Sequence, residues 1–388
     1  MRVLILGGDG YLGWPTAMYL SSRGHDVTVM DNYFRRRVCL ELDIPFLVDA
    51  PNLHERAALW RALGGSRIEV RIGDVTNYEE LSDTFRVTEP EVVIHYAEQP
   101  SAPYSMMGQR EAIFTLQNNL IGTANLVHAV HSLNPDCHIV KLGTMGEYGT
   151  PNIDIEEGWI DIDHNGRSDR FLFPRQAGSL YHTTKVQDTD LLWFYVRTWG
   201  LRVTDLMQGP VYGIFTEEMR FDDNLVTHFN YDEIFGTVLN RFIVQAVAGI
   251  PLTVYGTGEQ IRGYLNLIDT LECLRLAVEN PATRGELRVC NQFTETFSVN
   301  ELARKVVDAA ASIGINVSIE NHINPRIEAE EHYYNPVRRK LLDLGLEPHP
   351  LTEEVLTGML SFVRKHEECI RSEVILPRTK WQQTAAKG

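Results

Sequence analysis

Residues 3–13 read VLILGGDGYLG, an apolar run followed at once by glycines at positions 7, 10 and 13. The run at 3–6 is short and continuous, which predicts a strand that is buried on both faces. A helical pattern then continues to about Gly24, and a second apolar run follows at 27–30. The beginning of the chain therefore predicts a strand, a glycine-rich turn, a helix and a second strand.

The glycine spacing, together with the residue that ends the second run, indicates a dinucleotide site. Gly7 and Gly10 allow a tight turn beside a diphosphate, Gly13 allows close packing of helix on strand, and the helix N-terminus favours an anion. Asp31 stands where this fold places the acid that binds a ribose diol. It favours NAD over NADP because it would repel a 2′-phosphate, and the arginines at 35–37 weaken this preference. A plain strand-turn-helix is the alternative.

Strands and helices alternate through the first half of the chain. The segments at 68–72, 92–95 and 138–142 predict three more strands, and a long helical segment spans about 109–133. This alternation predicts an α/β fold with a Rossmann-like, doubly wound parallel sheet. Such a sheet binds its ligands at the carboxyl ends of the strands.

The domain organisation follows from where the alternation weakens, near position 205. We expect an NAD-binding domain at 1–205 and a smaller substrate lobe at 206–388 whose segments interleave with the first domain. The interruption at 32–65, helical at 53–63, is expected to cover the cofactor or a partner subunit. Elements expected in the second half are helices at about 235–248, 269–279 and 299–313 and a strand at 252–255.

Tyr181 and Lys185 lie four residues apart, so in a helix their side chains share one face. A tyrosine hydroxyl with an ordinary pKa of about 10 is a poor base at neutral pH. A lysine ammonium beside it lowers that pKa. Thr144, at the end of the strand predicted from 138, would add a hydroxyl that binds the same substrate alcohol. This spacing is common on solvent-exposed helices, so it indicates a catalytic pair only in combination with the dinucleotide site predicted at the start of the chain.

The predicted cofactor site extends along the same edge of the sheet. Asp74 follows the strand at 68–72 and is expected to bind the adenine amine, and Ala97 follows the strand at 92–95. The residues predicted to bind NAD are Gly7, Asp9, Gly10, Tyr11, Leu12, Gly13, Asp31, Asn32, Arg35, Asp74, Val75, Ala97, Asn119, Tyr181 and Lys185.

The composition limits the partners of the chain. With 388 residues and 44% hydrophobic content it can bury a large core, and its net charge of -16 argues against nucleic-acid or anionic-membrane surfaces. Five scattered cysteines without a CxxC pair predict neither a disulfide framework nor a metal site. No membrane-spanning run or targeting segment is expected, so the predicted location is the cytoplasm.

Longer segments carry a more specific signal than the glycine motif. They are GGDGYLGW at 7–14, SAPYSM at 101–106, KLGTMGEYGTPNIDIEEG at 141–158, HNGR at 164–167, LTVYGTGEQIRGYL at 252–265, NQFTETFSVNEL at 291–302 and PRIEAEEHYYN at 325–335. On these segments nearly the whole chain resembles the UDP-sulfoquinovose synthase family, a nucleotide-sugar branch of the extended short-chain dehydrogenases/reductases (extended SDR). The interruption at 32–65 is also typical of that branch.

The resemblance implies an activity. NAD would oxidise C4 of UDP-glucose, with Tyr181 as base, Thr144 steering the hydroxyl and Lys185 tuning Tyr181. Water would then leave across C5–C6, sulfite would add at C6, and C4 would be reduced again, so the cofactor is regenerated in each turnover. UDP-glucose and sulfite are therefore the expected partners, and a homodimer is expected.

Two positions depart from related patterns. Related dehydratases carry an adjacent Asp-Glu pair after the active-site threonine, and here those places hold Met145 and Gly146. His182 and Glu147 are the nearest candidates for acid-base work at C5, although a packed helix histidine and a loop-positioning glutamate are equally open. Pro100 stands where the branch resembled carries an arginine, and the loss of a cation affects sulfite delivery rather than oxidation at C4.

The substrate residues follow from the resemblance as well. Arg262 and Arg326 are expected to bind the diphosphate, because a planar guanidinium matches phosphate oxygens, and their motifs favour this over the alternative of a surface salt bridge. Thr253, Val254 and Tyr255 match the strand that lines uracil, and Gln208 is expected to face the sugar. Gln260 completes the predicted substrate set. Asn119 matches a helix asparagine that holds a backbone kink or a water.

Three rival functions stay open from the sequence. A UDP-glucose 4-epimerase would need Thr144, Tyr181 and Lys185 but no group at C5. A 5,6-dehydratase or other C6-modifying relative would not use sulfite, and Pro100 favours it. A non-catalytic NAD-binding regulator would be expected to lose the tyrosine or the lysine, and this chain keeps both.

Overall fold

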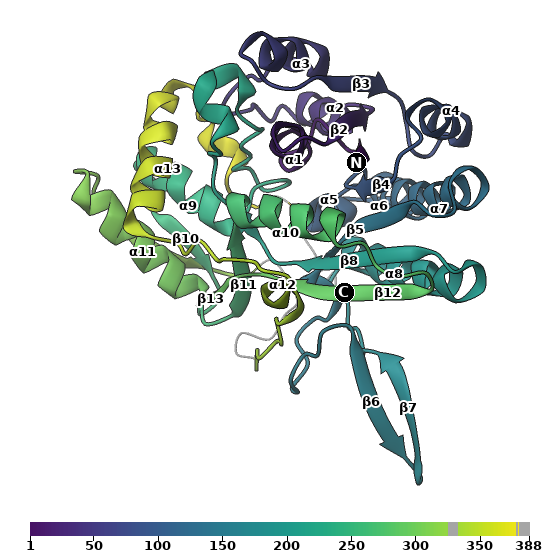
Figure 1. Ribbon diagram of the computed structural model, residues 1–388. Coiled ribbons are helices and arrows are strands. Elements are labelled where there is room, and N and C mark those ends of the chain that lie inside the picture. Colours follow the sequence, from purple (N-terminus) through teal and green to yellow (C-terminus); the bar gives the residue numbers. More distant parts are fainter. Residues whose placement is uncertain (325–332, 378, 380–388) are drawn as a thin grey trace.

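A seven-stranded parallel sheet forms the centre of the computed structural model, which describes residues 1–324, 333–377 and 379 (Figure 1). The strands run in the order β12-β8-β5-β4-β1-β2-β3. Their bounds are β1 Arg2–Leu6, β2 Asp26–Asp31, β3 Ile68–Ile72, β4 Val92–His95, β5 His138–Thr144, β8 Arg202–Gln208 and β12 Glu286–Gln292. The order reverses between β1 and β4, which is where such sheets bind ligands. The predicted Rossmann-like fold is confirmed.

Helices cover both faces of the sheet. On one face α4 (Tyr78–Thr88), α7 (Gly122–Leu133) and α8 (Leu180–Trp199) pack in a row, and on the other lie α1 (Gly13–Ser22) and α10 (Leu267–Glu279). The sheet buries Lys141 of β5 and Asp205 of β8, and apolar side chains such as Leu4, Ile5 and Ile94 are fully buried in it. This agrees with the continuous apolar runs of a strand covered on both faces.

The segment before α7 contains a local irregularity. The helical stretch predicted at 109–133 is divided into α6 (Gln109–Leu116), a π-helical turn η1 (Gln117–Ile121) and α7, with a short α5 (Ala102–Ser105) before it. Asn119 lies in the π turn and is fully buried. Wider turns of this kind often occur at functional sites, because they redirect a side chain out of the regular helix.

The predicted interruption at 32–65 packs against the glycine-rich turn and the sheet edge. It forms α2 (Phe34–Glu41) and α3 (Leu53–Ala62), which lie beside α1 and β3 (Figure 1). A capping box between Asn52 and Glu55 starts α3. Leu53 and Trp60 are buried in the main core, so the segment is an integral part of the first half of the chain.

The second half of the chain returns to the central sheet. β12 pairs in parallel with β8 over its whole length, from Glu286 beside Arg202 to Gln292 beside Gln208. The boundary expected at 205 falls inside β8, so one strand carries the chain from the expected first domain into the second. Two elements of the second half therefore belong to the central sheet layer: β12 pairs with β8, and α10 packs on β5.

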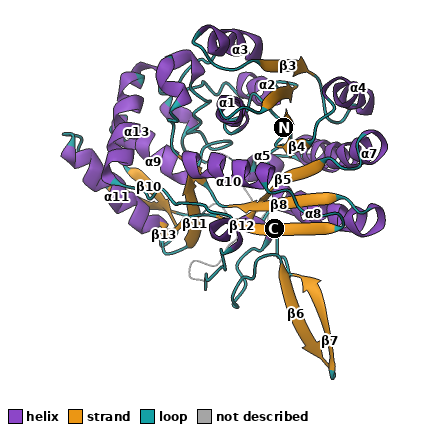
Figure 2. Cartoon of the chain, in the orientation of Figure 1, coloured by secondary structure: helices purple, strands orange, loops and turns teal. Residues whose placement is uncertain are grey.

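The remaining second-half elements form a smaller layer beside the sheet (Figure 2). It contains α9 (Val238–Val247), α11 (Val299–Ser312), α12 (Lys340–Asp343) and α13 (Glu353–Lys365), with strands β9 (Val211–Tyr212), β10 (Leu252–Tyr255), β11 (Ile261–Asn266), β13 (Glu295–Ser298) and β14 (Ile319–His322). β13, β11 and β9 form one small sheet, and β10 pairs with β14 in another. These strands face the carboxyl edge of the large sheet and close one side of the cavity described below.

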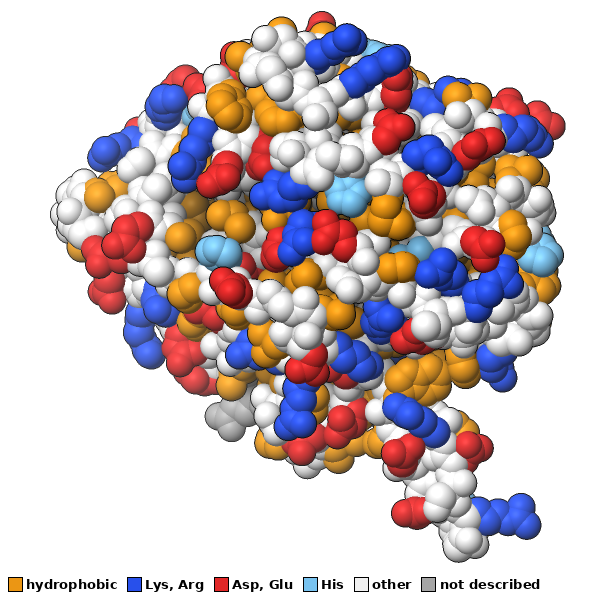
Figure 3. Space-filling view, in the orientation of Figure 1, with side chains coloured by type: hydrophobic (Ala, Val, Ile, Leu, Met, Phe, Trp, Pro, Cys, Tyr) orange, Lys and Arg blue, Asp and Glu red, His pale blue; other side chains and the backbone are white. Residues whose placement is uncertain are grey.

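A hairpin that the sequence did not reveal leaves the body of the molecule. β6 (Trp159–His164) and β7 (Arg167–Leu172) pair antiparallel around a turn at Asn165 and Gly166, and the hairpin extends away from the sheet (Figures 1 and 3). Charged side chains of both signs cover it in the space-filling view. Trp159 packs edge-on against Trp193 of α8 and anchors its base.

Among the described residues, no helix combines the length and the apolar character needed to cross a membrane.

Candidate active site

A cavity of about 750 Å³ opens at the carboxyl ends of the central strands. Its wall begins at the glycine-rich turn after β1 and continues past the ends of β2, β4, β5 and β8. The second-half residues Tyr255, Gln260 and Arg262 form the opposite wall. The cavity is therefore large enough for a dinucleotide end and a second ligand, and its position agrees with the sheet edge predicted from the sequence.

The glycine-rich turn forms a cradle that side chains would fill. A Cβ atom added at Gly13 would lie 2.0 Å from the carbonyl oxygen of Gly7, so helix α1 can approach the turn only because position 13 is glycine. Gly7, Gly10, Tyr11, Leu12 and Gly13 all border the cavity. The backbone thus fits a diphosphate at the start of α1, as the motif predicts.

Asp31 ends β2 at the cavity wall. Its carboxylate accepts hydrogen bonds from the backbone amides of Asp9 (2.8 Å) and Tyr33 (2.6 Å). Burial and the nearby charge of Asp9 raise the pKa of Asp31 to about 6. The group is therefore held by the backbone at the place where a ribose diol is expected.

The other predicted cofactor residues lie around Asp31. Asn32 and Arg35 border the cavity, as do Val75 and Ala97 at the ends of the neighbouring strands. Asp74 accepts a hydrogen bond from Asn32 at 2.8 Å, which joins the ends of β2 and β3. Arg35 donates to Asn230 at 2.8 Å and packs over the ring of Phe235, so the second half of the chain fixes its position.

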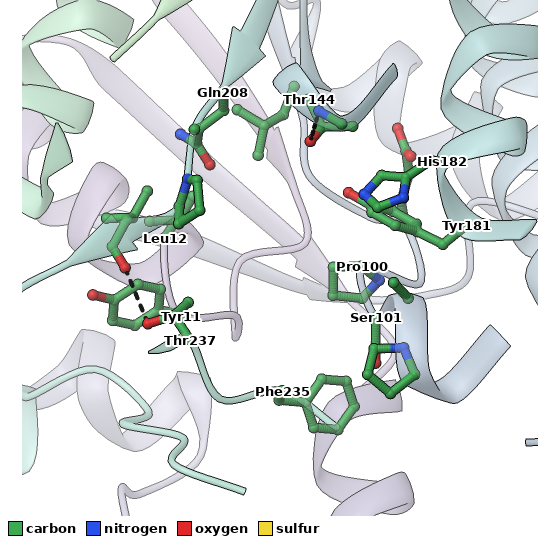
Figure 4. Close-up of a pocket in the computed structure, with 18 of the residues that line it drawn as sticks. Tyr11, Leu12, Pro100, Ser101, Thr144, Tyr181, His182, Gln208, Phe235 and Thr237 are labelled. Carbon is green, nitrogen blue, oxygen red and sulfur yellow. Dashed lines mark hydrogen bonds between the residues drawn. The ribbon is translucent and has the colours of Figure 1, made fainter. Parts of the chain in front are cut away.

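Thr144, Tyr181 and Lys185 come together as the sequence predicts. Thr144 is the last residue of β5, and Tyr181 lies in the first turn of α8 and Lys185 in the next (Figure 4). Both Thr144 and Tyr181 border the cavity. The Lys185 ammonium lies 6.0 Å from the centre of the Tyr181 ring and donates to the carbonyl of Leu142 at 2.5 Å.

The electrostatic effect on Tyr181 differs from the expectation. Burial raises the pKa of Tyr181, and the charges of Glu98 and Glu147 raise it further. Lys185 forms an ion pair with Glu98, which is buried in the cavity wall after β4. Because this carboxylate compensates the ammonium, the lowering of the Tyr181 pKa by Lys185 does not appear in this arrangement. Sequence spacing could not reveal Glu98 as the partner of Lys185.

His182 fills the space beside Thr144 that a side chain at position 146 would need. A Cβ atom on Gly146 would lie 2.4 Å from His182 Nε2 and 2.5 Å from Cδ2. The other ring nitrogen, Nδ1, lies 2.9 Å from the hydroxyl of Ser179, the N-cap of α8. His182 borders the cavity, and its ring centre is 5.0 Å from that of Tyr181 (Figure 4). The imidazole thus stands where the dehydratase pattern carries its acidic pair.

Glu147 faces away from the cavity. It is fully buried, and its carboxylate lies 3.6 Å from both Lys141 and Arg175. It also accepts a hydrogen bond from Thr189 at 3.2 Å. The expectation that Glu147 exchanges protons with the substrate is therefore corrected: its cations and α8 hold it behind the wall, where the substrate does not reach.

Asn119 also lies behind the residues that border the cavity. The Asn119 side chain accepts from the amide of Gln99 at 2.8 Å and donates to Thr184 at 2.9 Å. It therefore ties the loop after β4 to α8, while its neighbour Asn118 borders the cavity. The predicted contact of Asn119 with the cofactor is replaced here by a positioning role at the π turn.

The predicted substrate residues divide into two groups. Gln208, Tyr255, Gln260 and Arg262 border the cavity, and Gln208 pairs in register with Thr144 on the neighbouring strand. Thr253 and Val254 are buried below the surface of β10, where Thr253 is hydrogen bonded to Gln245. The predicted contact of these two residues with uracil is therefore corrected, because the strand presents Tyr255 instead.

Arg326 lies outside the described residues. A second arginine that the sequence reasoning missed, Arg241 of α9, borders the cavity and packs over the ring of Tyr255 at 4.7 Å. The sequence predicted a helix that contains Arg241, but it did not indicate that this helix packs against β10. Arg241 and Arg262 together give the substrate wall two cations.

Pro100 and Ser101 border the cavity on the same side as His182 and Tyr181 (Figure 4). Ser101 donates to the carbonyl of Ile234 at 2.5 Å, which fixes the loop against the second half of the chain. Pro100 presents no charge and no donor to the cavity, so the wall next to the catalytic group is neutral at this point.

Comparison with known proteins places these features in a family. The model of the NAD dependent epimerase/dehydratase family matches residues 3–291. The chain is 48% identical to the chloroplastic UDP-sulfoquinovose synthase of Spinacia oleracea, over 100% of this chain and 80% of that protein. It is 45% identical to UDP-sulfoquinovose synthase of Sulfolobus acidocaldarius, over 99% and 98%. The fold is similar to that of UDP-glucose 4-epimerase from Bifidobacterium longum, crystallised with NAD+ and UDP (TM-score 0.70, 19% identity, covering 95% and 99%).

Proposed function

The chain belongs to the NAD dependent epimerase/dehydratase family and, within it, to the UDP-sulfoquinovose synthases, and from this premise we propose that it forms UDP-sulfoquinovose from UDP-glucose and sulfite. It is an NAD-dependent enzyme that modifies a nucleotide sugar. One observation carries the proposal: Thr144, Tyr181 and His182 border the same cavity, next to the dinucleotide cradle.

NAD, when bound, supplies the group that takes a hydride from C4 of the sugar and returns it at the end. The glycine-rich turn and Asp31 fit its diphosphate and ribose, and the contact of Lys185 with its second ribose stays a prediction. Tyr181 takes the proton of the 4-hydroxyl during oxidation, and Thr144 donates or accepts a hydrogen bond at the same oxygen. Tyr181 returns that proton when C4 is reduced.

His182 is the group we assign to the C5 proton. A ketone at C4 makes this proton acidic, and among the candidates named from the sequence His182 is the one at the cavity wall. The imidazole takes the C5 proton while the 6-hydroxyl leaves as water with a proton from solvent, which the proton released by bisulfite later replaces. The sulfur of bisulfite then bonds to C6, and C5 regains a proton from His182. The sum is UDP-glucose plus bisulfite giving UDP-sulfoquinovose and water.

The UDP half is assigned to the second-half wall. Arg241 and Arg262 supply positive charge for a diphosphate, and Tyr255 supplies a ring beside them. Gln208, next to Thr144 on the neighbouring strand, is then placed to bind the sugar between the two ends. The assignment of Arg326 to the diphosphate stays a prediction.

A C6-modifying enzyme that does not use sulfite is the second candidate, because Pro100 leaves the cavity wall near His182 without a positive charge. A single experiment separates the candidates: incubation with UDP-glucose in deuterated water, with and without sulfite. We expect deuterium at C5 and, with sulfite, a 6-sulfonate. Label without sulfonate would indicate the C6-modifying enzyme, and inversion at C4 without label would indicate the epimerase.

We also propose a homodimer, formed by the outer faces of α7 and α8. Aromatic rings gather there: Trp199 stacks on His131 at 4.0 Å and lies 4.2 Å from Tyr195. The neighbouring Phe194 is 49% exposed, a large apolar surface for a side chain in water. Phe194→Glu should therefore raise the monomer fraction in sedimentation experiments, and an unchanged mass would contradict the proposed face.

A further inference from the structure

Three arginines at 35–37 follow Asp31 by four to six residues, and the second of them, Arg36, is bonded to Asp9. In related folds an arginine near this position accommodates the 2′-phosphate of NADP. Arg36 donates to both carboxylate oxygens of Asp9, at 2.7 and 3.0 Å, and to the carbonyls of Ala50 and Pro51, both at 2.8 Å. A guanidinium has five N–H donors, so four hydrogen bonds fix both its position and its direction.

Asp9 is the centre of a buried ion cluster. It is 2% exposed and also contacts Arg56 of α3 at 2.5 Å and His228 at 3.2 Å. Arg56 is fully buried beneath the ring of Trp14. Although burial opposes it, the hydrogen bonds from His228 and Arg36 hold the pKa of Asp9 well below its ordinary value, so the group is a carboxylate.

The Asp9 carboxylate lies close to the ribose-binding acid. The backbone amide of Asp9 donates to Asp31, and the charge of Asp9 is one of the causes that raise the pKa of Asp31. A 2′-phosphate at this place would therefore meet the Asp31 carboxyl, while the Asp9 charge is already paired with Arg36 and Arg56. The nearest arginines are held elsewhere, Arg36 by Asp9 and Arg35 by Asn230 and Phe235.

We propose that Asp9 is a second determinant of specificity for NAD over NADP, which acts by holding Arg36 away from the ribose of the cofactor. Asp31 repels the 2′-phosphate directly, whereas Asp9 removes the cation that would compensate that repulsion. The residue is thus a positioning residue of the cofactor site. This arrangement explains how the chain can carry Asp31, which selects NAD, so close to the arginines at 35–37, which would favour NADP.

The test measures binding of NADH and NADPH to nucleotide-depleted protein by nicotinamide fluorescence. Asp9→Asn keeps the shape of the side chain and removes its charge, so Arg36 can turn toward the ribose. We expect the affinity for NADPH relative to NADH to rise by about tenfold or more, which corresponds to about 1.4 kcal/mol. The gain should disappear in Asp9→Asn/Arg36→Met, while Arg36→Met alone should show none.

An unchanged NADPH-to-NADH ratio in Asp9→Asn, or a gain that persists without Arg36, would overturn the proposal. Asp9→Asn leaves the buried Arg56 without its carboxylate partner, which can itself disturb the fold. A second pair of variants therefore keeps Asp9 unchanged. Asp31→Asn should improve NADPH binding, and adding Arg36→Met should leave this improvement unaltered, since Asp9 still holds Arg36. If the improvement depends on Arg36, the guanidinium is not held and the proposal fails.

Discussion

Gly146→Ala should separate the C5 chemistry from the oxidation at C4. The new methyl would lie 2.4 Å from His182 Nε2, and the three atoms nearest to it all belong to the His182 ring. Ordinary contact begins near 3.4 Å, so the ring has to move by about 1 Å. A misplacement of about 1 Å in a catalytic group costs about 10²-fold in rate.

The measurement uses UDP-glucose in two assays with the same protein. Deuterium incorporation at C5 in deuterated water should fall by about a hundredfold, because His182 no longer reaches the proton. Single-turnover reduction of the bound nicotinamide should change much less, because Thr144 and Tyr181 are not among the nearest neighbours of the added methyl. A loss of both activities in equal measure would argue for general damage to the site.

Two controls make the outcome decisive. Gly358→Ala, in α13, adds the same methyl where no atom lies within 4 Å, so it should leave both assays unchanged. Gly146→Ala/His182→Gln should be no slower in C5 exchange than His182→Gln alone, because both changes act on the same imidazole. C5 exchange in Gly146→Ala within about threefold of the unaltered protein would refute the assignment of His182, since the expected loss is far larger.

Three further predictions concern the same site and its surroundings. Tyr181→Phe should abolish C4 oxidation and leave NAD bound, which absorbance of the purified protein checks; more than trace activity would show a different base. Glu98→Gln should lower the pKa of Tyr181, because the Glu98 charge now raises it, and thus shift the acidic limb of C4 oxidation to lower pH; an unmoved limb would contradict this. Burial, with Arg56 and Arg36, lowers the pKa of His228 to about 4, below its unfolded value of about 6.5, so stability should fall as pH drops through that window. The melting temperature of His228→Gln should fall less than that of the unaltered protein between about pH 6.5 and 4. An equal fall would exclude this histidine as the cause.

Much of the fold was predictable because its signals are local. The strands at 68–72 and 92–95 have the predicted limits: the apolar run of the second marks a buried strand, and the alternation of apolar and charged residues in the first marks a strand at the sheet edge. Asp31 and Thr144 stand at strand ends, and parallel strands bring their carboxyl ends to one edge. The meeting of two such residues at one cavity therefore follows from the sequence pattern.

What was missed depends on partners far away in the chain. The interior of β8 carries Asp205, which is fully buried 3.5 Å from Lys141 and interrupts the apolar run expected of a central strand. Glu147 follows Thr144 by three residues, but Lys141 and Arg175 decide its direction. In the same way Glu98 becomes important only through Lys185, which lies on another element. Spacing along the chain contains no information on such pairs.

The position of β12 also governs how the protein can be made. The sheet edge beyond β8 is closed by residues 286–292, so a growing chain carries β8 as an open edge until more than seventy further residues have left the ribosome. Unpaired strand edges attract other chains, and domains generally fold as units during synthesis. A fragment that stops at 205 would therefore be expected to aggregate, whereas the full chain protects that edge with its own late strand.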